Sequence, residues 1–236
     1  MKFRMMMVAL LLCGMVVPAF ADSAREKDVE RIRSARFAFE DIMNAPDRAI
    51  PEELLGSASC IAIIPGVKGA AFVFGGRYGR GLVTCRNGNR WSAPAFLMLS
   101  GGSFGFQIGG SSTDIVMIFR NRGGMNHLLS DKFTVGADAT AAAGPVGRHA
   151  AAATDAEMHA EILTYSRSRG VFAGVSLNGA VVKPDRGADL ALYGADIEPA
   201  SILDGHAGVP AEARGLLDVI AREAGGGRQR QYAKER

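Results

Sequence analysis

The sequence predicts an α+β fold: a glycine-rich, largely antiparallel, twisted sheet, curled or sandwich-like, packed by an amphipathic N-terminal helix and a few short helices. Three observations indicate this. Phe104, Phe106 and Ile108 alternate with small or polar residues, which is the period of a strand. Residues 115–119 contain no polar side chain, which is typical of a strand covered on both faces. Glycine accounts for 30 of 236 residues, against a usual share of about 7%, and it clusters where turns and close strand contacts are expected.

The N-terminal residues 1–21 have the pattern of a secretory signal. Two basic residues precede an apolar run, and Ala19-Phe20-Ala21 forms a small-x-small cleavage site. The run is shorter than the roughly 20 residues that a permanent transmembrane helix needs. We therefore expect export to the periplasm with cleavage after Ala21. The alternative, a lipoprotein modified at Cys13, is less favoured because Leu12 stands where a small residue is required.

The mature chain is expected to form a single domain over residues 22–224, followed by a disordered basic tail at 225–236. The full chain carries 27 Lys and Arg against 24 Asp and Glu. Removal of Lys2 and Arg4 with the signal leaves 25 against 24, so the mature protein is close to neutral. This balance does not indicate nucleic-acid binding.

Two cysteines remain after the signal is removed. Cys60 and Cys85 lie in apolar runs read as neighbouring strands, and an oxidising compartment favours a disulfide between them. Such a bond would close a loop of about 25 residues and add about 3 kcal/mol of stability. The alternative is two buried free thiols. Their spacing, without a nearby histidine pair, argues against a zinc site.

The first predicted element after the signal is a helix over residues 23–43. Val29, Ile32, Ala35 and Phe39 recur at intervals of three and four, and Asn44-Ala45-Pro46 ends the pattern. The basic residues fall largely on the other face. Two interpretations stay open: a helix packed on the sheet with a solvated polar face, or an element lying on a membrane surface.

The rest of the chain reads mainly as short strands and helices. Residues 51–55 begin a short helix, because proline and two acidic residues occupy its first turn. Strands are predicted at 60–64, 70–74 and 81–85, with turns at Gly75-Gly76 and Asn87-Gly88. Further along we expect strands at 133–135, 161–166 and 171–182, with strand and turn over 137–153. Helices are expected at 125–129, from Asp185 to Tyr193 with Gly194 ending it, and, as an amphipathic helix, at 210–224.

No catalytic, metal or cofactor site is predicted. The segment from Gly101 to Gly105 matches the G-x-S-x-G pattern of serine hydrolases, but that motif requires a helix directly after the serine, and a strand pattern follows here. The four histidines lack metal-ligand spacing, and neither a phosphate-binding loop nor a dinucleotide fingerprint occurs. The sequence therefore gives no ground for an enzyme.

Basic residues at the ends of the predicted strands, together with those of the first helix, form the candidate binding set. If the fold gathers some of them on one rim, they make a site for anionic lipid headgroups, at about 1 kcal/mol per cation near a charged membrane. The alternative is a scatter of solvated charges. The candidates are Arg31, Arg33, Arg36, Lys68, Arg77, Arg80, Arg120, Arg122, Arg167 and Arg169.

Several motifs in order resemble the SYLF family of lipid-binding domains, over roughly residues 32–194. They are WSAPAF at 91–96, GGSFGFQIG at 101–109, FTVGADA at 133–139, GPVGR at 144–148 and YSRSRGVFAGVSL at 165–177.

The resemblance implies a non-enzymatic domain that binds phospholipids, with the helix at 23–43 contributing to membrane contact. Eukaryotic relatives favour phosphoinositides, and a fungal branch also binds actin filaments. We read no Src-homology-3 or FYVE domain in these residues, and Lys68 stands alone where many relatives carry a lysine pair. Because the chain looks exported, actin is not an expected partner.

The function expected from residues and resemblance together is a non-enzymatic periplasmic phospholipid-binding protein that acts at an anionic membrane surface. The alternative is a structural or protein-interaction module of the cell envelope without lipid specificity.

Overall fold

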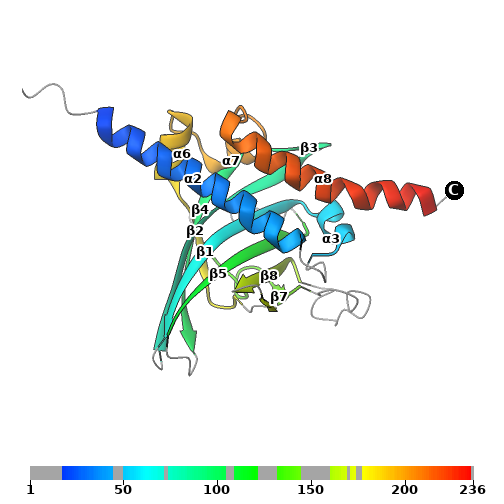
Figure 1. Ribbon diagram of the computed structural model, residues 1–236, viewed down its shortest axis with the longest axis horizontal. Coiled ribbons are helices and arrows are strands. Elements are labelled where there is room, and N and C mark those ends of the chain that lie inside the picture. The colour runs from blue at the N-terminus through cyan, green and yellow to red at the C-terminus, as the bar shows by residue number, and fades with distance from the viewer. Residues whose placement is uncertain are drawn as a thin grey trace, which may run out of the picture.

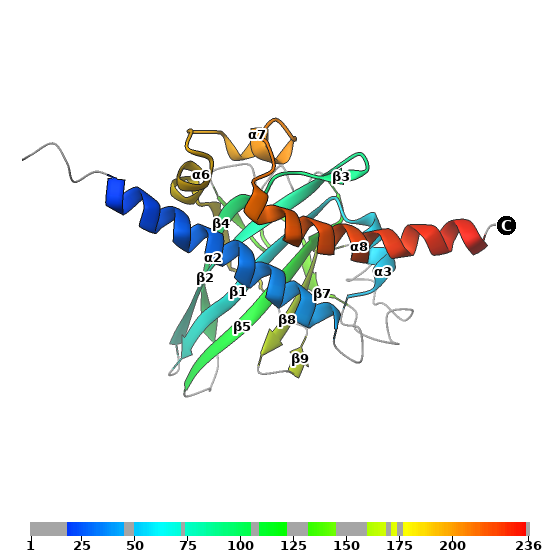
Figure 2. The same cartoon turned by 45° about the horizontal axis from the view of Figure 1, so that its top comes forward.

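The fold is built on one large curled sheet with helices on its outer face (Figures 1 and 2). The computed structural model describes residues 18–44, 50–71, 74–104, 109–121, 132–144, 160–168, 171–173 and 177–234. The helices are α2 (Pro18–Met43), α3 (Glu52–Ser57), α6 (Arg186–Tyr193), α7 (Pro199–Leu203) and α8 (Ala211–Lys234). The strands are β1 (Cys60–Ala71), β2 (Phe74–Asn87), β3 (Arg90–Trp91), β4 (Ala95–Phe104), β5 (Gly109–Phe119), β6 (Phe133–Thr134), β7 (Ala141–Ala143), β8 (Ile162–Ser168), β9 (Val171–Ala173) and β10 (Val181–Pro184).

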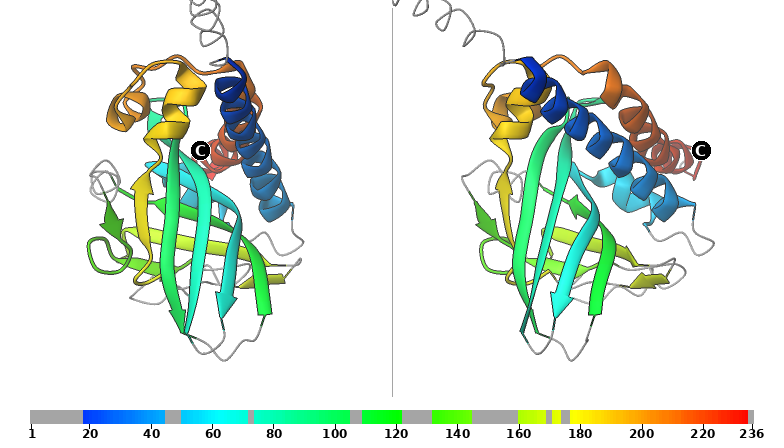
Figure 3. Two further views of the ribbon diagram at one scale, coloured as in Figure 1. Left: turned by 90° about the vertical axis from the view of Figure 1, so that its left-hand side faces the viewer. Right: turned by 60° about the vertical axis from the view of Figure 1, so that its left-hand side comes forward.

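The strand order is β6-β10-β4-β2-β1-β5-β8-β7, with β3 paired to β2 and β9 paired to β8. Every strand pair except β7 with β8 is antiparallel. The hairpin of β1 and β2 lies at the centre, flanked by β4 and β5, and the sheet curls toward a half-barrel (Figure 3). The predicted class, an α+β fold with a curled and largely antiparallel sheet, is confirmed.

Both faces of the central strands are buried, which gives the molecule two apolar cores. On β1, Ile61 and Ile63 face the core under the helices, whereas Cys60, Ala62 and Ile64 face the core inside the curl. This alternation is the period of two that a strand imposes. Residues 115–119 of β5 are likewise fully buried, as the absence of polar residues predicts.

Helices α2 and α8 lie side by side across the outer face of the sheet (Figure 1). The apolar stripe predicted for α2 is buried there, through Ile32, Ala35, Phe39 and Ile42. The helix is therefore a packed element of the core, and its apolar stripe is covered. None of the helices in the described part of the chain combines the length and the apolarity that a bilayer crossing requires.

The start of the sheet differs from the prediction. The three short strands expected at 60–64, 70–74 and 81–85 are two long strands, and Gly75-Gly76 lies inside β2, where these residues pair with Ser103 and Gly102 of β4. The predicted turn at this glycine pair is wrong, because paired glycines also occur where neighbouring strands approach closely. The turn at Asn87-Gly88 is confirmed and joins β2 to β3.

The helices also differ at their ends. The helix predicted at 23–43 begins earlier, at Pro18. The prediction of a disordered tail is wrong over 225–234, because α8 continues to Lys234. Glycines at 225–227 lower the helix propensity, but the residues beyond them are mostly good helix formers and no proline interrupts them. The short helix α7 was not predicted, and α6 ends at Gly194 as expected.

Some predictions fall on residues outside the described part of the chain. These are the strand positions Phe106 and Ile108, the helix at 125–129, the greater part of 137–153, and the candidates Arg122 and Arg169.

The predicted disulfide is present. Cys60 and Cys85 are directly opposite each other on β1 and β2, and their Sγ atoms are bonded. Both side chains are buried in the core inside the curl. The bond therefore ties together the two central strands.

Two glycines of β2 allow the backbones of the central hairpin to approach closely. A Cβ atom at Gly81 would lie 2.3 Å from the carbonyl oxygen of Ile63, and one at Gly79 would lie 2.7 Å from Val67 Cγ2. No side chain fits at Gly81 without a shift of the β1 backbone. These glycines are therefore required by the packing of β1 against β2.

We expect Gly81→Ala to lower the free energy of unfolding by about 1–3 kcal/mol, because the added methyl group overpacks a contact with backbone atoms. Urea unfolding measures the effect. The control is Gly208→Ala, where a Cβ atom meets nothing within 4 Å and a change within about 0.5 kcal/mol is expected. Equal effects of the two substitutions would contradict this account of the hairpin.

Candidate functional site

A β-bulge in β1 shapes the floor of the candidate site. The pairing of β1 with β5 shifts register between Ile64 and Val67, and Gly66 within this interval has a left-handed backbone with φ of 55°. The Gly66 N–H donates a hydrogen bond to Asp114 Oδ1 at 2.8 Å. A bulge bends its strand and increases the local twist. β1 thus bends where it emerges from beneath α2.

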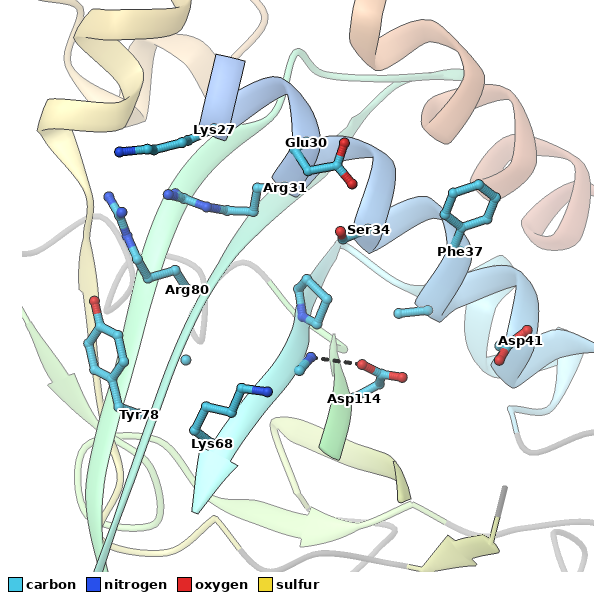
Figure 4. A pocket seen from close by; sticks show the side chains of 14 residues that line it. Lys27, Glu30, Arg31, Ser34, Phe37, Asp41, Lys68, Tyr78, Arg80 and Asp114 are labelled. Atoms are coloured by element: carbon cyan, nitrogen blue, oxygen red, sulfur yellow. Dashed lines mark hydrogen bonds between the residues drawn. The ribbon is translucent and has the colours of Figure 1, made fainter. Parts of the chain in front are cut away.

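An open groove of about 750 Å³ lies between α2 and this part of the sheet (Figure 4). The helix contributes one wall, and β1, β2 and β5 contribute the other. It is lined by Lys27, Glu30, Arg31, Ser34, Phe37, Ala38, Asp41, Pro65, Gly66, Lys68, Tyr78, Gly79, Arg80 and Asp114.

Two aromatic rings at the groove are exposed. Phe37 on α2 has an exposed fraction of 58%, and Tyr78 on β2 has one of 49%. They lie on opposite walls of the groove in Figure 4. Tyr78 suits an interface between apolar and aqueous phases, because its ring is apolar and its hydroxyl is polar, and Phe37 adds apolar surface.

The acidic residues of the groove are occupied by neighbours. Glu30 forms an ion pair with Arg33 at 2.6 Å, Asp41 pairs with Arg167 at 3.2 Å, and Asp114 accepts the hydrogen bond from Gly66. Their negative charge is therefore partly compensated.

Two lysines of the groove form no ion pair with the residues that the structure describes. Among the described residues Lys27 and Lys68 form no ion pair, and Lys68 Nζ donates only a hydrogen bond to Ser112 Oγ at 3.3 Å. Both side chains are exposed. The groove thus offers a ligand two ammonium groups that are not held in an ion pair by these residues.

The arginines of the groove belong to a buried cluster of charges where α2 meets α6. Arg31 binds Asp28 at 2.8 Å and Asp185 at 3.1 Å, and its guanidinium carbon lies 4.9 Å from the centre of the Phe96 ring. Arg80 of β2 binds the same Asp185 carboxylate. Burial raises the pKa of Asp28 and lowers that of Arg31, and the attraction between the two opposes both shifts.

A further carboxyl group, Asp189 of α6, lies next to this cluster. Its Oδ1 accepts the Phe96 N–H at 2.8 Å, and within the described residues its buried Oδ2 has no hydrogen-bond partner. Burial is the main cause that raises its pKa to about 7, and the nearby Asp185 adds to this; the Phe96 N–H acts in the opposite direction.

The structure divides the predicted binding residues among several places. Lys68 and Arg80 line the groove together with Arg31, but Arg31 is buried and doubly paired. Arg33 and Arg36 are exposed on α2 and pair with Glu30 and Glu40 of the same helix. Their role in lipid binding stays a prediction.

The remaining candidates in the described part of the chain do not line the groove. Arg77 is half-buried on β2, Arg120 Nη1 donates to the Ala160 carbonyl at 3.4 Å, and Arg167 pairs with Asp41. Those candidates that the structure describes are therefore not gathered on one rim.

Sequence analysis did not single out Lys27, Phe37 or Tyr78. The face of α2 that lines the groove has a pattern that the sequence shows. It consists of residues at intervals of three and four: Lys27, Arg31, Ser34, Ala38 and Asp41. The sequence alone left two interpretations of the polar face of this helix: solvated, or lying on a membrane surface.

A comparison with protein families gives a match over residues 100–223 with a family described as "Ysc84: Las17-binding protein actin regulator". The chain belongs to the Ysc84 (SYLF) family. This confirms the resemblance inferred from the five motifs. The description of the family names binding and no reaction.

Individual relatives agree. The chain is 37% identical over 175 residues to an SH3 domain-containing protein of Schizosaccharomyces pombe, and the aligned region covers 72% of this chain and 40% of the relative. It is 32% identical over 212 residues to protein YSC84 of Saccharomyces cerevisiae, covering 88% and 45%. It is 34% identical over 179 residues to human SH3 domain-containing YSC84-like protein 1, covering 75% and 52%. The chain spans about half the length of the curated relatives it matches.

We expect Arg31→Met to lower the free energy of unfolding by about 3–5 kcal/mol, because it leaves the buried Asp28 carboxylate without its ion-pair partner and takes one of two arginines from Asp185. The control on the same helix is Arg33→Met, which removes only an exposed pair with Glu30 and should change stability by less than about 1 kcal/mol. Denaturant unfolding of both variants checks this. Similar losses would show that burial of the cluster contributes little.

The Asp189 carboxyl predicts a specific dependence of stability on pH. Its pKa is higher in the folded than in the unfolded protein, so the folded state holds a proton that the unfolded state has lost. The resulting stabilisation is complete below pH 3.8 and is lost as the pH rises to about 7.

In Asp189→Asn the amide keeps an acceptor for the Phe96 N–H and does not titrate. Stability of this variant should therefore fall less than that of the wild type between pH 4 and pH 7, as measured by thermal unfolding across that range. Parallel pH profiles would show that Asp189 ionises normally in the folded protein.

Proposed function

We propose that this protein is a non-enzymatic, exported phospholipid-binding protein that acts at an anionic membrane surface, with the groove beneath α2 receiving the headgroup. The observation that carries the proposal is the groove itself. It holds two exposed aromatic rings on opposite walls and two lysines that form no ion pair within the described residues.

The chemistry of the groove suits a phosphate attached to an apolar body. Lys27 and Lys68 supply ammonium groups for the phosphate, and each cation near an anionic surface adds about 1 kcal/mol to binding. Phe37 and Tyr78 supply apolar surface for the part of the lipid next to its headgroup. The periplasmic location is supported by the secretory pattern of residues 1–21.

A protein-interaction module of the cell envelope is the second candidate. The family description names Las17, a protein partner, and actin. We do not transfer either partner to this chain, because an exported protein would not meet them. The same face of α2 could instead bind an acidic protein segment.

Cosedimentation of the full mature chain with vesicles tests the proposal. We expect stronger binding to phosphatidylglycerol vesicles than to phosphatidylcholine vesicles. Replacing Lys27 and Lys68 together by Gln should weaken binding to the anionic vesicles about 30-fold, which corresponds to about 2 kcal/mol for two cations.

The matched control replaces Lys132 and Lys183 by Gln. Both are exposed, neither lines the groove, and the change in net charge is the same. Equal weakening of the two double variants would assign binding to overall charge instead of the groove. Binding that is equal for both lipids, or absent with both, would contradict the lipid function and favour the protein-interaction module.

A further inference from the structure

The Arg80 side chain connects the groove to the buried charge cluster. Its exposed fraction is 41%, and it lines the groove, but its Nε and Nη2 both donate to Asp185 Oδ2, at 2.9 and 2.5 Å. The Asp185 side chain is only 7% exposed. Arg80 is therefore a third cation that a ligand in the groove can reach, although the buried Asp185 carboxylate balances its charge.

The position of Asp185 makes this pairing unusual. Asp185 occupies the N-cap position of α6, where an aspartate side chain normally accepts a hydrogen bond from the first turn of the helix. Here the side chain makes no capping hydrogen bond. Its carboxylate is directed to Arg31 and Arg80 instead.

The two arginines bound to Asp185 are not equivalent. Arg31 has a second carboxylate partner, Asp28, and its side chain is 8% exposed. Arg80 has Asp185 as its one ion-pair partner within the described residues and faces the groove. Loss of the charge on Asp185 would thus release Arg80 and leave Arg31 paired.

An anion in the groove would compete with Asp185 for Arg80. The head groups of Lys27, Arg31 and Arg80 point toward the same end of the groove in Figure 4. A guanidinium group has five N–H donors. Asp185 accepts hydrogen bonds from only two nitrogen atoms of Arg80, Nε and Nη2. A phosphate at this end of the groove can therefore bind the remaining donors, or replace Asp185 as the partner of Arg80.

From these contacts we infer that Asp185 is an internal counter-ion that withholds Arg80 from ligands, so that the Arg80–Asp185 pair sets how strongly the groove binds a phosphate-bearing headgroup. The inference rests on the proposed function of the groove. It makes Asp185 an inhibitory residue for lipid binding, although it does not itself contact the lipid.

A double-mutant cycle on the full mature chain tests the inference by cosedimentation with phosphatidylglycerol vesicles. Asp185→Asn should bind about fivefold more tightly than the wild type, the factor that corresponds to about 1 kcal/mol for one added cation. The gain should disappear in Asp185→Asn combined with Arg80→Gln. Circular dichroism confirms that each variant is folded.

The outcomes separate the two proposals. If folded Asp185→Asn binds the vesicles only as tightly as the wild type, or less tightly, the counter-ion inference is overturned and the lipid function stands. A gain that persists without Arg80 also overturns it. Absence of binding by the wild type and by Asp185→Asn overturns both.

A measurement on the wild type covers the case in which Asp185→Asn does not fold. Titration with dihexanoyl phosphatidylglycerol below its micelle concentration should shift the NMR signal of the Arg80 Nε–H group and leave that of Arg31 in place. Lipid binding with no change at Arg80 overturns the inference. Inorganic phosphate in a parallel titration shows whether the phosphate alone is enough or the lipid body is required.

Discussion

The carboxylate of Asp185 accepts hydrogen bonds from α2 and from β2 at a single oxygen, and the position of α2 over the sheet depends on this contact. Arg31 reaches it from the helix and Arg80 from the strand, while Asp185 itself precedes α6. Next to it, Asp189 holds the backbone of Phe96 on β4. Buried ion pairs often add little to stability, but they are demanding in geometry. Together with the buried apolar stripe of α2, this cluster connects the helix to β2 and α6.

The sheet contributes a second constraint, the absence of side chains where β1 and β2 approach each other. Gly81 admits the β1 backbone, and Gly79 admits the side chains of Ile64 and Val67, at distances that a Cβ atom would not allow. Gly66 turns the strand through a left-handed conformation and is held by Asp114. The groove therefore lies between a helix positioned by buried charges and a strand bent at a bulge.

Those features of the fold that follow from local periodicity were predictable from the sequence. The apolar stripe of α2 and the uninterrupted apolar run of β5 both appear in the structure as buried faces. Glycine pairs were ambiguous, because the same residues mark turns and close strand contacts, and Gly75-Gly76 proved to be the second. The end of α8 was ambiguous for a related reason: three glycines weaken a helix without ending it.

The binding residues were harder to predict because the partners of a charge are distant in sequence. Asp185 is 154 residues from Arg31 and 105 from Arg80, so no local pattern shows that one carboxylate serves both. The disulfide was easier to predict, because Cys60 and Cys85 lie in apolar runs that read as neighbouring strands.

The distribution of cations in this protein follows the different chemistry of arginine and lysine. Arginine is less strongly hydrated and binds carboxylates with a planar fork of donors, so it suits the buried pairs made by Arg31 and Arg80. Lysine is a compact and strongly hydrated charge, and Lys27 and Lys68 remain exposed in the open groove. The number of basic residues near a site thus overstates its available charge. What a ligand meets is set by which cations the protein's own carboxylates have already bound.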